Sequence, residues 1–275
     1  MSLYLILSPN LKTSSMKVSN LLREIGFGFE TLLLNLPWEM EGIVTDLASE
    51  LVSYDEFIIE AIRRRLIPEP IGSWEYAFKP VLDALHPLSR KYPDLRTRCY
   101  GRSEHEFALM GAAVRMTSLT LRTMVTGEVV IDRWRGVLIH SLDVDREARE
   151  AEVGAIEEKM RECAICVSDM GGRWLKRPLK NAGIDVKIHY VEKPYHFTPL
   201  MILKRKIARG SVNDEEIETL IRRHVEYVKG YIYRFDNRDR AYYEWAYDKV
   251  PWLRRKICKK EVEMLDSIIQ ASQIQ

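Results

Sequence analysis

The sequence has few of the features that mark membrane-spanning, secreted or fibrous proteins. In its 275 residues, no apolar run approaches the roughly 20 residues that a membrane-spanning helix needs, so we expect no membrane span. Residues 1–8 carry no basic leader, which is typical of a first strand and not of a signal peptide. A content of 46% hydrophobic and 30% charged residues is typical of a globular chain. We therefore expect a soluble protein with a cytoplasmic location.

Cysteine and glutamine are both scarce. Four cysteines are too few for a disulfide framework, and the CxxC pair of Cys163 and Cys166 lacks the second ligand pair of a structural zinc site. The apolar residues around this pair predict a buried strand, with a redox or metal role as the alternative. Glutamine occurs only at Gln270, Gln273 and Gln275, while Glu, Lys and Arg are abundant. This bias predicts a thermophilic source.

The common motifs of cofactor and hydrolytic sites are also missing. The sequence contains neither the dinucleotide-binding GxGxxG nor the phosphate-binding GxxxxGK[ST], and it contains neither HExxH nor GxSxG. No particular cofactor is therefore predicted. The formal net charge of +2 does not point to a class of partner.

Short apolar runs alternate with stretches of helical periodicity over the first two thirds of the chain. Continuous apolar runs of this length suit parallel strands that are buried on both faces. Their alternation with helices predicts a three-layer α/β fold, in which a parallel sheet of about five strands carries flanking helices. The expected strands are 3–7, 31–34, 95–100, 163–167 and 186–191. The expected helices are one that starts near Ser14 or Ser15 and ends at Gly26 and Gly28, then 40–66, 73–92 with interruptions at Pro80 and Pro87, 103–126 and 129–161.

The last part of the chain differs in composition. From residue 198 onward only helices are predicted, and residues 201–262 hold 16 Lys or Arg against 10 Asp or Glu. We therefore predict an α/β domain at 1–200 and a basic helical C-terminal extension at 201–275. Aromatic and basic residues mix at 242–247 and 252–256, a combination that can stack nucleobases and hold phosphates or can form the packing seam of a terminal helix.

Polar turns follow four of the expected strands, and they are the candidates for a site. In a parallel sheet, ligands bind outside the carboxyl ends of the strands. The turns are 8–10, 35–39, 101–105 and 168–173. Arg102 and Arg173 stand beside helix N-termini and would hold an anionic group, while Asn10 and Asn35 would orient it by hydrogen bonds.

Other residues of these turns complete the candidate site. His105 and Asp169 are the candidate catalytic residues, because both side chains can transfer protons. The remaining candidates for ligand binding are Ser103, Arg146, Gly171 and Gly172. The alternative for each turn is an ordinary connection between a strand and a helix.

Two further patterns predict structure more than function. The dense charges between residues 143 and 152 predict a solvated helix face with ion pairs between successive turns. His86 and His224 are also predicted to be solvated helix residues.

Local patterns over roughly residues 3–193 resemble the TraB/ChaN/Tiki group of α/β proteins, which is related to erythromycin-esterase-like enzymes. Four segments carry the resemblance: 32–37, 99–102, 145–147 and 164–172. The resemblance implies that this chain retains the α/β fold of the family and that the metal chemistry of the family is altered or lost in it. Asn10 stands near the place of a family His, Asn35 replaces a Glu, and Gly172 or Met170 replaces a later His. A neutral amide is a poor ligand for a hydrolytic metal, so we predict no stoichiometric catalytic metal, with a site built from His105, Asp169 and one Glu as the alternative.

Two functions from different classes follow. The first is a site for a small anionic ligand at the strand ends, in a divergent hydrolase or a non-catalytic binder. The second is a nucleic-acid or nucleotide-binding accessory protein that uses the basic C-terminal region. Its candidate residues are Lys204, Arg205, Lys206, Arg254, Arg255, Lys256, Lys259 and Lys260. The sequence leaves open whether the protein forms a homo-oligomer.

Overall fold

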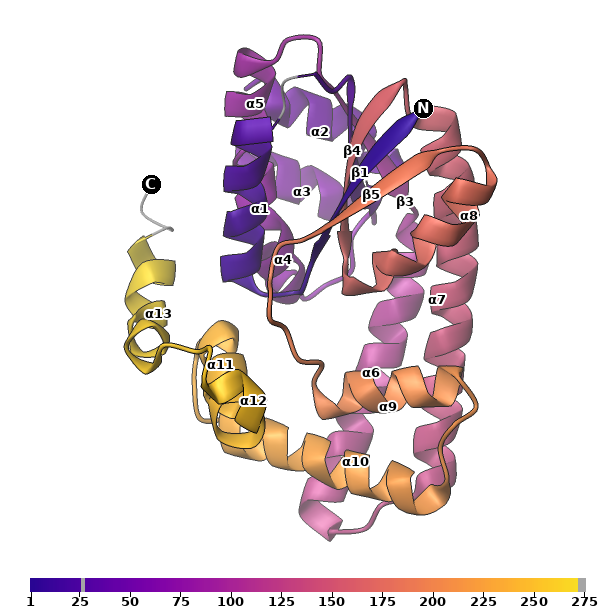
Figure 1. Ribbon diagram of the computed structural model, residues 1–275, viewed down its shortest axis with the longest axis vertical. Helices are drawn as coiled ribbons and strands as arrows, with labels where there is room; N and C mark the ends of the chain where they lie inside the picture. The colour runs from indigo at the N-terminus through magenta and orange to yellow at the C-terminus, as the bar shows by residue number, and fades with distance from the viewer. Residues whose placement is uncertain (26–27, 272–275) are drawn as a thin grey trace. The chain divides into compact units, whose positions relative to one another are not determined.

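A computed structural model describes residues 1–25 and 28–271, and in it five strands form a parallel sheet (Figure 1). The strand order is β3-β2-β4-β1-β5, and each neighbouring pair is parallel. The strands are β1 Ser2–Ser8, β2 Thr31–Pro37, β3 Arg96–Gly101, β4 Cys163–Asp169 and β5 Asp185–Tyr190. The predicted three-layer α/β fold is confirmed, including its five strands.

The chain divides into two compact units, which we call the sheet unit (residues 1–108 and 145–192) and the helical unit (residues 109–144 and 193–275). This division differs from the predicted boundary at residue 200. The sequence pattern identified 109–144 as parts of ordinary crossover helices. In the structure, apolar residues of this segment belong to the same core as the C-terminal helices. A compact unit is defined by the core its residues share, which continuity along the chain does not reveal.

Helices cover both faces of the sheet (Figure 1). One face carries α1–α5, and the other carries α8 and the part of α7 that belongs to the sheet unit. The helices of the first face are α1 Lys12–Ile25, α2 Glu41–Ala48, α3 Tyr54–Arg63, α4 Gly72–Leu82 and α5 Leu85–Lys91. The others are α6 Ser103–Thr126, α7 Ile131–Lys159 and α8 Lys176–Asn181, the last preceded by a 3-10 turn at Met170–Leu175. The expected end of the first helix at Gly26 lies outside the described residues.

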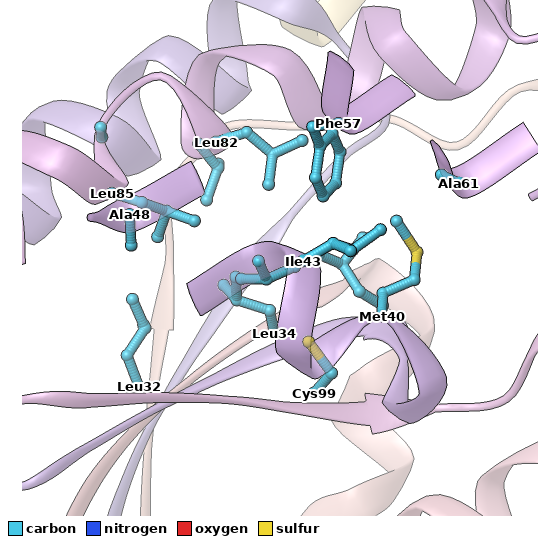
Figure 2. Close-up of a cluster of buried hydrophobic side chains, with 14 of the residues drawn as sticks. Leu32, Leu34, Met40, Ile43, Ala48, Phe57, Ala61, Leu82, Leu85 and Cys99 are labelled. Atoms are coloured by element: carbon cyan, nitrogen blue, oxygen red, sulfur yellow. The ribbon is translucent and has the colours of Figure 1, made fainter. Parts of the chain in front are cut away.

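Alternating side chains of the strands form the two cores of the sheet unit. Leu34 and Ile165 point to the face covered by α1–α5, whereas Leu33 and Cys166 point to the opposite face. Figure 2 shows the first core, where side chains of α2 and α3 pack over Leu32, Leu34 and Cys99. Burial of each large apolar side chain contributes about 1.5–3 kcal/mol, so strands buried on both faces anchor the sheet.

Two predicted helices are divided differently in the structure. The stretch 40–66 forms α2 and α3, because Ser53 starts a new helix by a capping box. Its hydroxyl accepts the Glu56 N–H at 3.3 Å, and the Glu56 carboxylate accepts the Ser53 N–H at 2.7 Å. The stretch 73–92 breaks at residues 83–84 and not at its prolines. Pro87 lies in the first turn of α5, where no N–H is needed, and Pro80 lies in the last turn of α4.

The helical unit contains the residues of α6 and α7 between 109 and 144 and the C-terminal helices. Its core includes the fully buried Trp134, Leu138 and Ile221. The C-terminal helices are α9 Pro199–Ala208, α10 Asp214–Tyr227, α11 Arg238–Lys249, α12 Pro251–Arg254 and α13 Lys259–Ala271, with a π-helical turn at Val228–Ile232 after α10. From residue 198 to 271 the structure has helices and no strand, as the sequence predicts.

His224 departs from its prediction as a solvated residue. It lies in α10 with its ring edge-on to Trp134, at 6.1 Å between centroids, and its Nε2 is 3.2 Å from the Thr120 hydroxyl. Burial lowers its pKa to about 4, because the charged imidazolium loses hydration. Helical periodicity did not separate this position from the exposed positions next to it.

None of the helices in residues 1–25 and 28–271 combines the length and the apolar character needed to cross a membrane.

Candidate functional site

The topology places a switch point at the carboxyl end of β4. The chain leaves β1 and β2 toward helices on one face of the sheet, and it leaves β4 toward α8 on the other face. Because β4 lies between β2 and β1, its final turn diverges from both neighbouring turns. Ligands of parallel α/β sheets bind where adjacent connections diverge in this way.

A cavity of about 130 Å³ lies at this switch point. Three strand ends form its floor, and α1 and α4 form its walls. The strand ends contribute Ser8, Pro9, Asn10, Leu34, Asn35, Leu36, Val167, Ser168 and Asp169. The helices contribute Ser15, Val18, Ala77, Phe78, Val81 and Leu82. The structure therefore brings Asn10, Asn35 and Asp169 to one cavity.

The two asparagines differ from the other polar groups of this cavity. Within the described residues, the side-chain amides of Asn10 and Asn35 have no hydrogen-bond partner in the protein. By contrast, the Ser15 hydroxyl donates to the Ala77 carbonyl. Each amide presents one acceptor oxygen and two donor hydrogens. The unpaired amides are thus available to hydrogen-bond a molecule in the cavity.

The turn after β4 fixes the Asp169 carboxylate. The Gly172 N–H donates to Asp169 Oδ1 at 3.0 Å, and the Arg149 guanidinium donates to the Gly171 carbonyl at 2.9 Å. A Cβ at Gly172 would collide with Ser168, and one at Gly171 would collide with Arg149. The two glycines do not line the cavity, so their part in the structure is to allow this close turn.

Two further carboxyl groups lie near Asp169. Glu106 is in the first turn of α6, and Glu152 is on α7, both in the sheet unit. Burial raises the pKa of Glu106 to about 7, and the charge of Asp169 adds to this effect. Burial and Asp169 also raise the pKa of Glu152 to about 8, against the opposing effect of Arg149. Both groups therefore carry a proton for part of the time at neutral pH.

These two glutamates were missed by the sequence interpretation. The charged run at 143–152 was expected to be a solvated face, and this is wrong for Glu152, which is half-buried. Its spacing from Val153 and Ile156, which pack on the sheet, is the signal that could have found it. Ser103 and Glu106 have the spacing of a capping box, which would place the Glu106 carboxylate at the start of the helix. In the structure the Ser103 hydroxyl donates to Glu39 Oε1 at 2.9 Å.

Tyr100 lies close enough to Glu152 to feel the charge of that carboxylate. Its hydroxyl donates to the Val167 carbonyl at 2.9 Å, and burial raises its pKa well above the usual value. Burial raises the pKa of the neighbouring Cys166 to about 12, so this thiol is not a nucleophile near neutral pH. The predicted buried strand around Cys163 and Cys166 is confirmed, and both cysteines are free.

The other predicted site residues lie outside the cavity lining. Arg102 is exposed and pairs with Glu104 at 3.1 Å. Arg146 and Arg173 are exposed, and His105 is partly buried. The cavity lining thus holds Asn10, Asn35 and Asp169 but not Arg102 or Arg173, which were expected to hold an anion.

Among the described residues, the side chains that could bind a metal ion are not gathered into a metal site. In residues 1–25 and 28–271, no group of three His, Cys, Asp or Glu side chains is placed to hold a metal ion. Glu106, Glu152 and Asp169 influence each other electrostatically but do not form such a group. The prediction of a protein without a catalytic metal stays a prediction.

In the basic C-terminal region, many of the groups that were candidates for nucleic-acid contact have partners within the helical unit. Lys206 pairs with Glu216, and Lys259 pairs with Glu244. The Arg254 guanidinium donates to the Tyr247 carbonyl at 2.8 Å. Tyr242 and Trp245 are buried, which favours the packing seam over base stacking for these two rings.

No protein-family model, curated protein or solved structure matches this chain. The resemblance to the TraB/ChaN/Tiki group therefore stays a prediction from local patterns.

Proposed function

We propose that the sheet unit binds a small organic molecule in the cavity at the carboxyl ends of β1, β2 and β4. The supporting observation is the convergence of three strand-end turns, which were nominated separately from the sequence, on one cavity at the switch point of the sheet. Within the described residues, Asn10 and Asn35 offer this cavity amides that are not used by the protein.

The volume of the cavity limits the size of the ligand. A buried apolar cavity of about 150 Å³ holds one benzene molecule. At about 130 Å³, this cavity suits a molecule of similar size, or a larger one that extends to solvent past the exposed Asn10. Its walls are apolar around Val18 and Phe78, so the ligand has an apolar body and a polar end.

A hydrolase-like activity is the catalytic form of this proposal. Glu106 and Glu152 have pKa values near neutrality and lie beside Asp169, which lines the cavity. Perturbed carboxyl groups of this kind are frequent at catalytic sites, although structural networks also produce them. Hydrolysis of phenyl acetate that is lost in the variant Asp169→Asn would support catalysis. Binding without turnover would leave a ligand-binding protein.

The binding proposal is tested with a library of fragments of six to ten non-hydrogen atoms. Ligand-observed NMR on the full chain detects binding, and competition between hits shows that they share one site. The variant Ala77→Leu fills part of the cavity from α4 and should weaken hits at least tenfold. The control variant Ala113→Leu adds the same side chain at an exposed position of α6 and should leave them unchanged.

Two results would contradict the proposal. One is the absence of any hit against a protein whose fold is intact by circular dichroism. The other is a set of hits that Ala77→Leu and Ala113→Leu affect equally, because such hits would bind elsewhere.

A further inference from the structure

We infer that the cavity takes a small organic cation, an ammonium group on an apolar body, and not the anionic ligand expected from the sequence. This inference rests on the proposed function and names its ligand class. It is drawn from the distribution of charge around the cavity and from the acceptors that line it.

The lining of the cavity carries negative charge only. Asp169 is the single ionisable side chain among its fifteen lining residues in the described parts of the chain. An anion placed there would meet this carboxylate without a lining cation to offset it. The arginines that were expected to offset it, Arg102 and Arg173, do not reach the lining.

Further acidic side chains near Asp169 add to the negative charge at this end of the cavity. Glu106 and Glu152 lie close enough to feel its charge, and Asp145 adds to the repulsion on Glu152. Arg149 opposes the repulsion on Glu152, and its guanidinium also donates to the Gly171 carbonyl. A cation bound at Asp169 would relieve the repulsion between these carboxyl groups.

The hydrogen-bond acceptors on the cavity lining suit an ammonium group both in their number and in the negative charge that Asp169 carries. An ammonium ion has three donor hydrogens and no acceptor. The Asp169 carboxylate and the amide oxygens of Asn10 and Asn35 are acceptors on the same lining. Hydrogen bonds between an ammonium ion and a carboxylate are charge-assisted, and they are stronger than those between neutral groups.

The apolar side of the cavity suits the body of such a ligand. Val18, Val81 and Leu82 form an aliphatic wall, and Phe78 adds an aromatic ring. One aromatic ring is the apolar body that the cavity volume allows, and a methylene that carries the ammonium group can extend toward the exposed Asn10 and Asp169, so benzylamine is a suitable probe.

Three probes with one ring and different head groups test the inference. Binding of benzylamine, benzyl alcohol and benzoate to the full chain is measured by NMR titration at pH 7.5. We expect benzylamine to bind about fivefold to tenfold more tightly than benzyl alcohol, and benzoate to bind most weakly. Equal affinities, or tighter binding of benzoate, would overturn the inference while leaving the proposed binding site in place.

A matched pair of variants assigns the preference to one carboxylate. Asp169→Asn keeps an oxygen that can accept the Gly172 N–H, and it should bring benzylamine and benzyl alcohol within about twofold of each other. Glu104→Gln removes an exposed carboxylate outside the cavity and should preserve the preference. A preference that survives Asp169→Asn would overturn the inference. If none of the three probes binds the wild type, the ligand class and, with an empty fragment screen, the binding site itself are both rejected.

The head-group comparison in the wild-type protein stands without any variant. A fold defect in Asp169→Asn, detected by circular dichroism, would therefore leave the order of the three affinities as the deciding result. In that case, a raised salt concentration should weaken the binding of benzylamine, which is charged, and leave the binding of benzyl alcohol unchanged.

Discussion

The sheet unit and the helical unit both bury titratable groups, and the two kinds of group respond to pH in opposite directions. In the sheet unit, burial raises the pKa values of Glu106 and Glu152 to about 7 and about 8. In the helical unit, burial lowers the pKa of His224 to about 4. The same loss of hydration favours the neutral form in each case, which is the protonated form of an acid and the deprotonated form of a base. The pH response of each unit is therefore set by the type of residue it buries.

The largest expected effects come from truncating one fully buried leucine in each unit. Leu33→Ala removes packing from the core between the sheet and α7 and α8, and Leu138→Ala removes packing from the helical core. Each should cost about 2–5 kcal/mol of stability in its own unit. Hydrogen exchange followed by mass spectrometry reports amide protection separately for the two units. Equal loss of protection in both units from either variant would show one cooperative domain in place of two.

A glycine-to-alanine exchange should have opposite signs in the two units. Gly172→Ala introduces a Cβ into Ser168 and 3.2 Å from a methyl of Leu7, so it should destabilise the sheet unit by about 1–3 kcal/mol. Gly111→Ala lies within α6 with nothing near its added Cβ, and it should stabilise the helical unit by about 0.5–1 kcal/mol. Thermal unfolding measures both shifts. If Gly172→Ala leaves the stability unchanged, the turn after β4 can adjust its conformation to the added Cβ, and the shape of the cavity would change with the turn.

Acidification should stabilise the sheet unit through its buried carboxyl groups. Between about pH 4.5 and 8 the folded unit binds more protons than the unfolded chain at Glu106 and Glu152, so its stability falls as pH rises. Glu152→Gln should remove part of this slope, and its stabilising effect should be largest at the high-pH end of this range. Hydrogen exchange of the sheet unit at several pH values provides the measurement, with the exposed Glu104→Gln as control. An unchanged slope in Glu152→Gln would contradict the raised pKa.

Acidification should destabilise the helical unit in a partly overlapping range. Between about pH 6.5 and 4, His224 is protonated in the unfolded chain but stays mostly neutral in the folded unit. The stability of the unit therefore decreases as the pH is lowered through this range. His224→Gln should flatten the loss, because a glutamine at this position does not titrate. Amide protection of the helical unit across this range checks the sign. His86→Gln, in the sheet unit, serves as the matched control and should leave the slope of the helical unit unchanged.

The smallest expected effects come from one helix cap in each unit. Ser53 caps α3 by a capping box, whereas Asn213 caps α10 by a single acceptor at 2.9 Å from the Glu216 N–H. Ser53→Ala and Asn213→Ala should each cost about 1 kcal/mol, with the loss confined to the unit that holds the cap. Local hydrogen exchange at the first turns of α3 and α10 measures both. A cap whose removal changes nothing would mean that tertiary packing alone defines that helix end.

Much of the fold was predictable because local patterns and the sheet agree. Two segments, 31–34 and 163–167, are apolar on both faces of a strand and therefore predict strands that are covered on both sides. Both form strands that lie between two others in the sheet. The helix at 103–126 has the predicted bounds. The strand order had no such local signal, because it depends on which face each connecting helix covers.

Part of the candidate site was predictable for a related reason. Asn10, Asn35 and Asp169 each follow a parallel strand, and parallel strands bring their carboxyl ends to one edge. The rule identifies the edge but not the cavity. Arg102 and Arg173 follow strands in the same way, yet they point to solvent, since the orientation of a side chain depends on the turn that carries it.

The sequence by itself determined the class of the fold, the strands, most of the helices and the edge of the sheet where polar side chains gather, because each of these follows from residue periodicity and from the parallel direction of the strands. Only the tertiary structure decided which helices share a core, that Glu106 and Glu152 are half-buried near Asp169, and that the cavity lining carries an acid without a base. The physical reason is that burial and electrostatic environment arise from residues far apart in the chain, so no local pattern contains them.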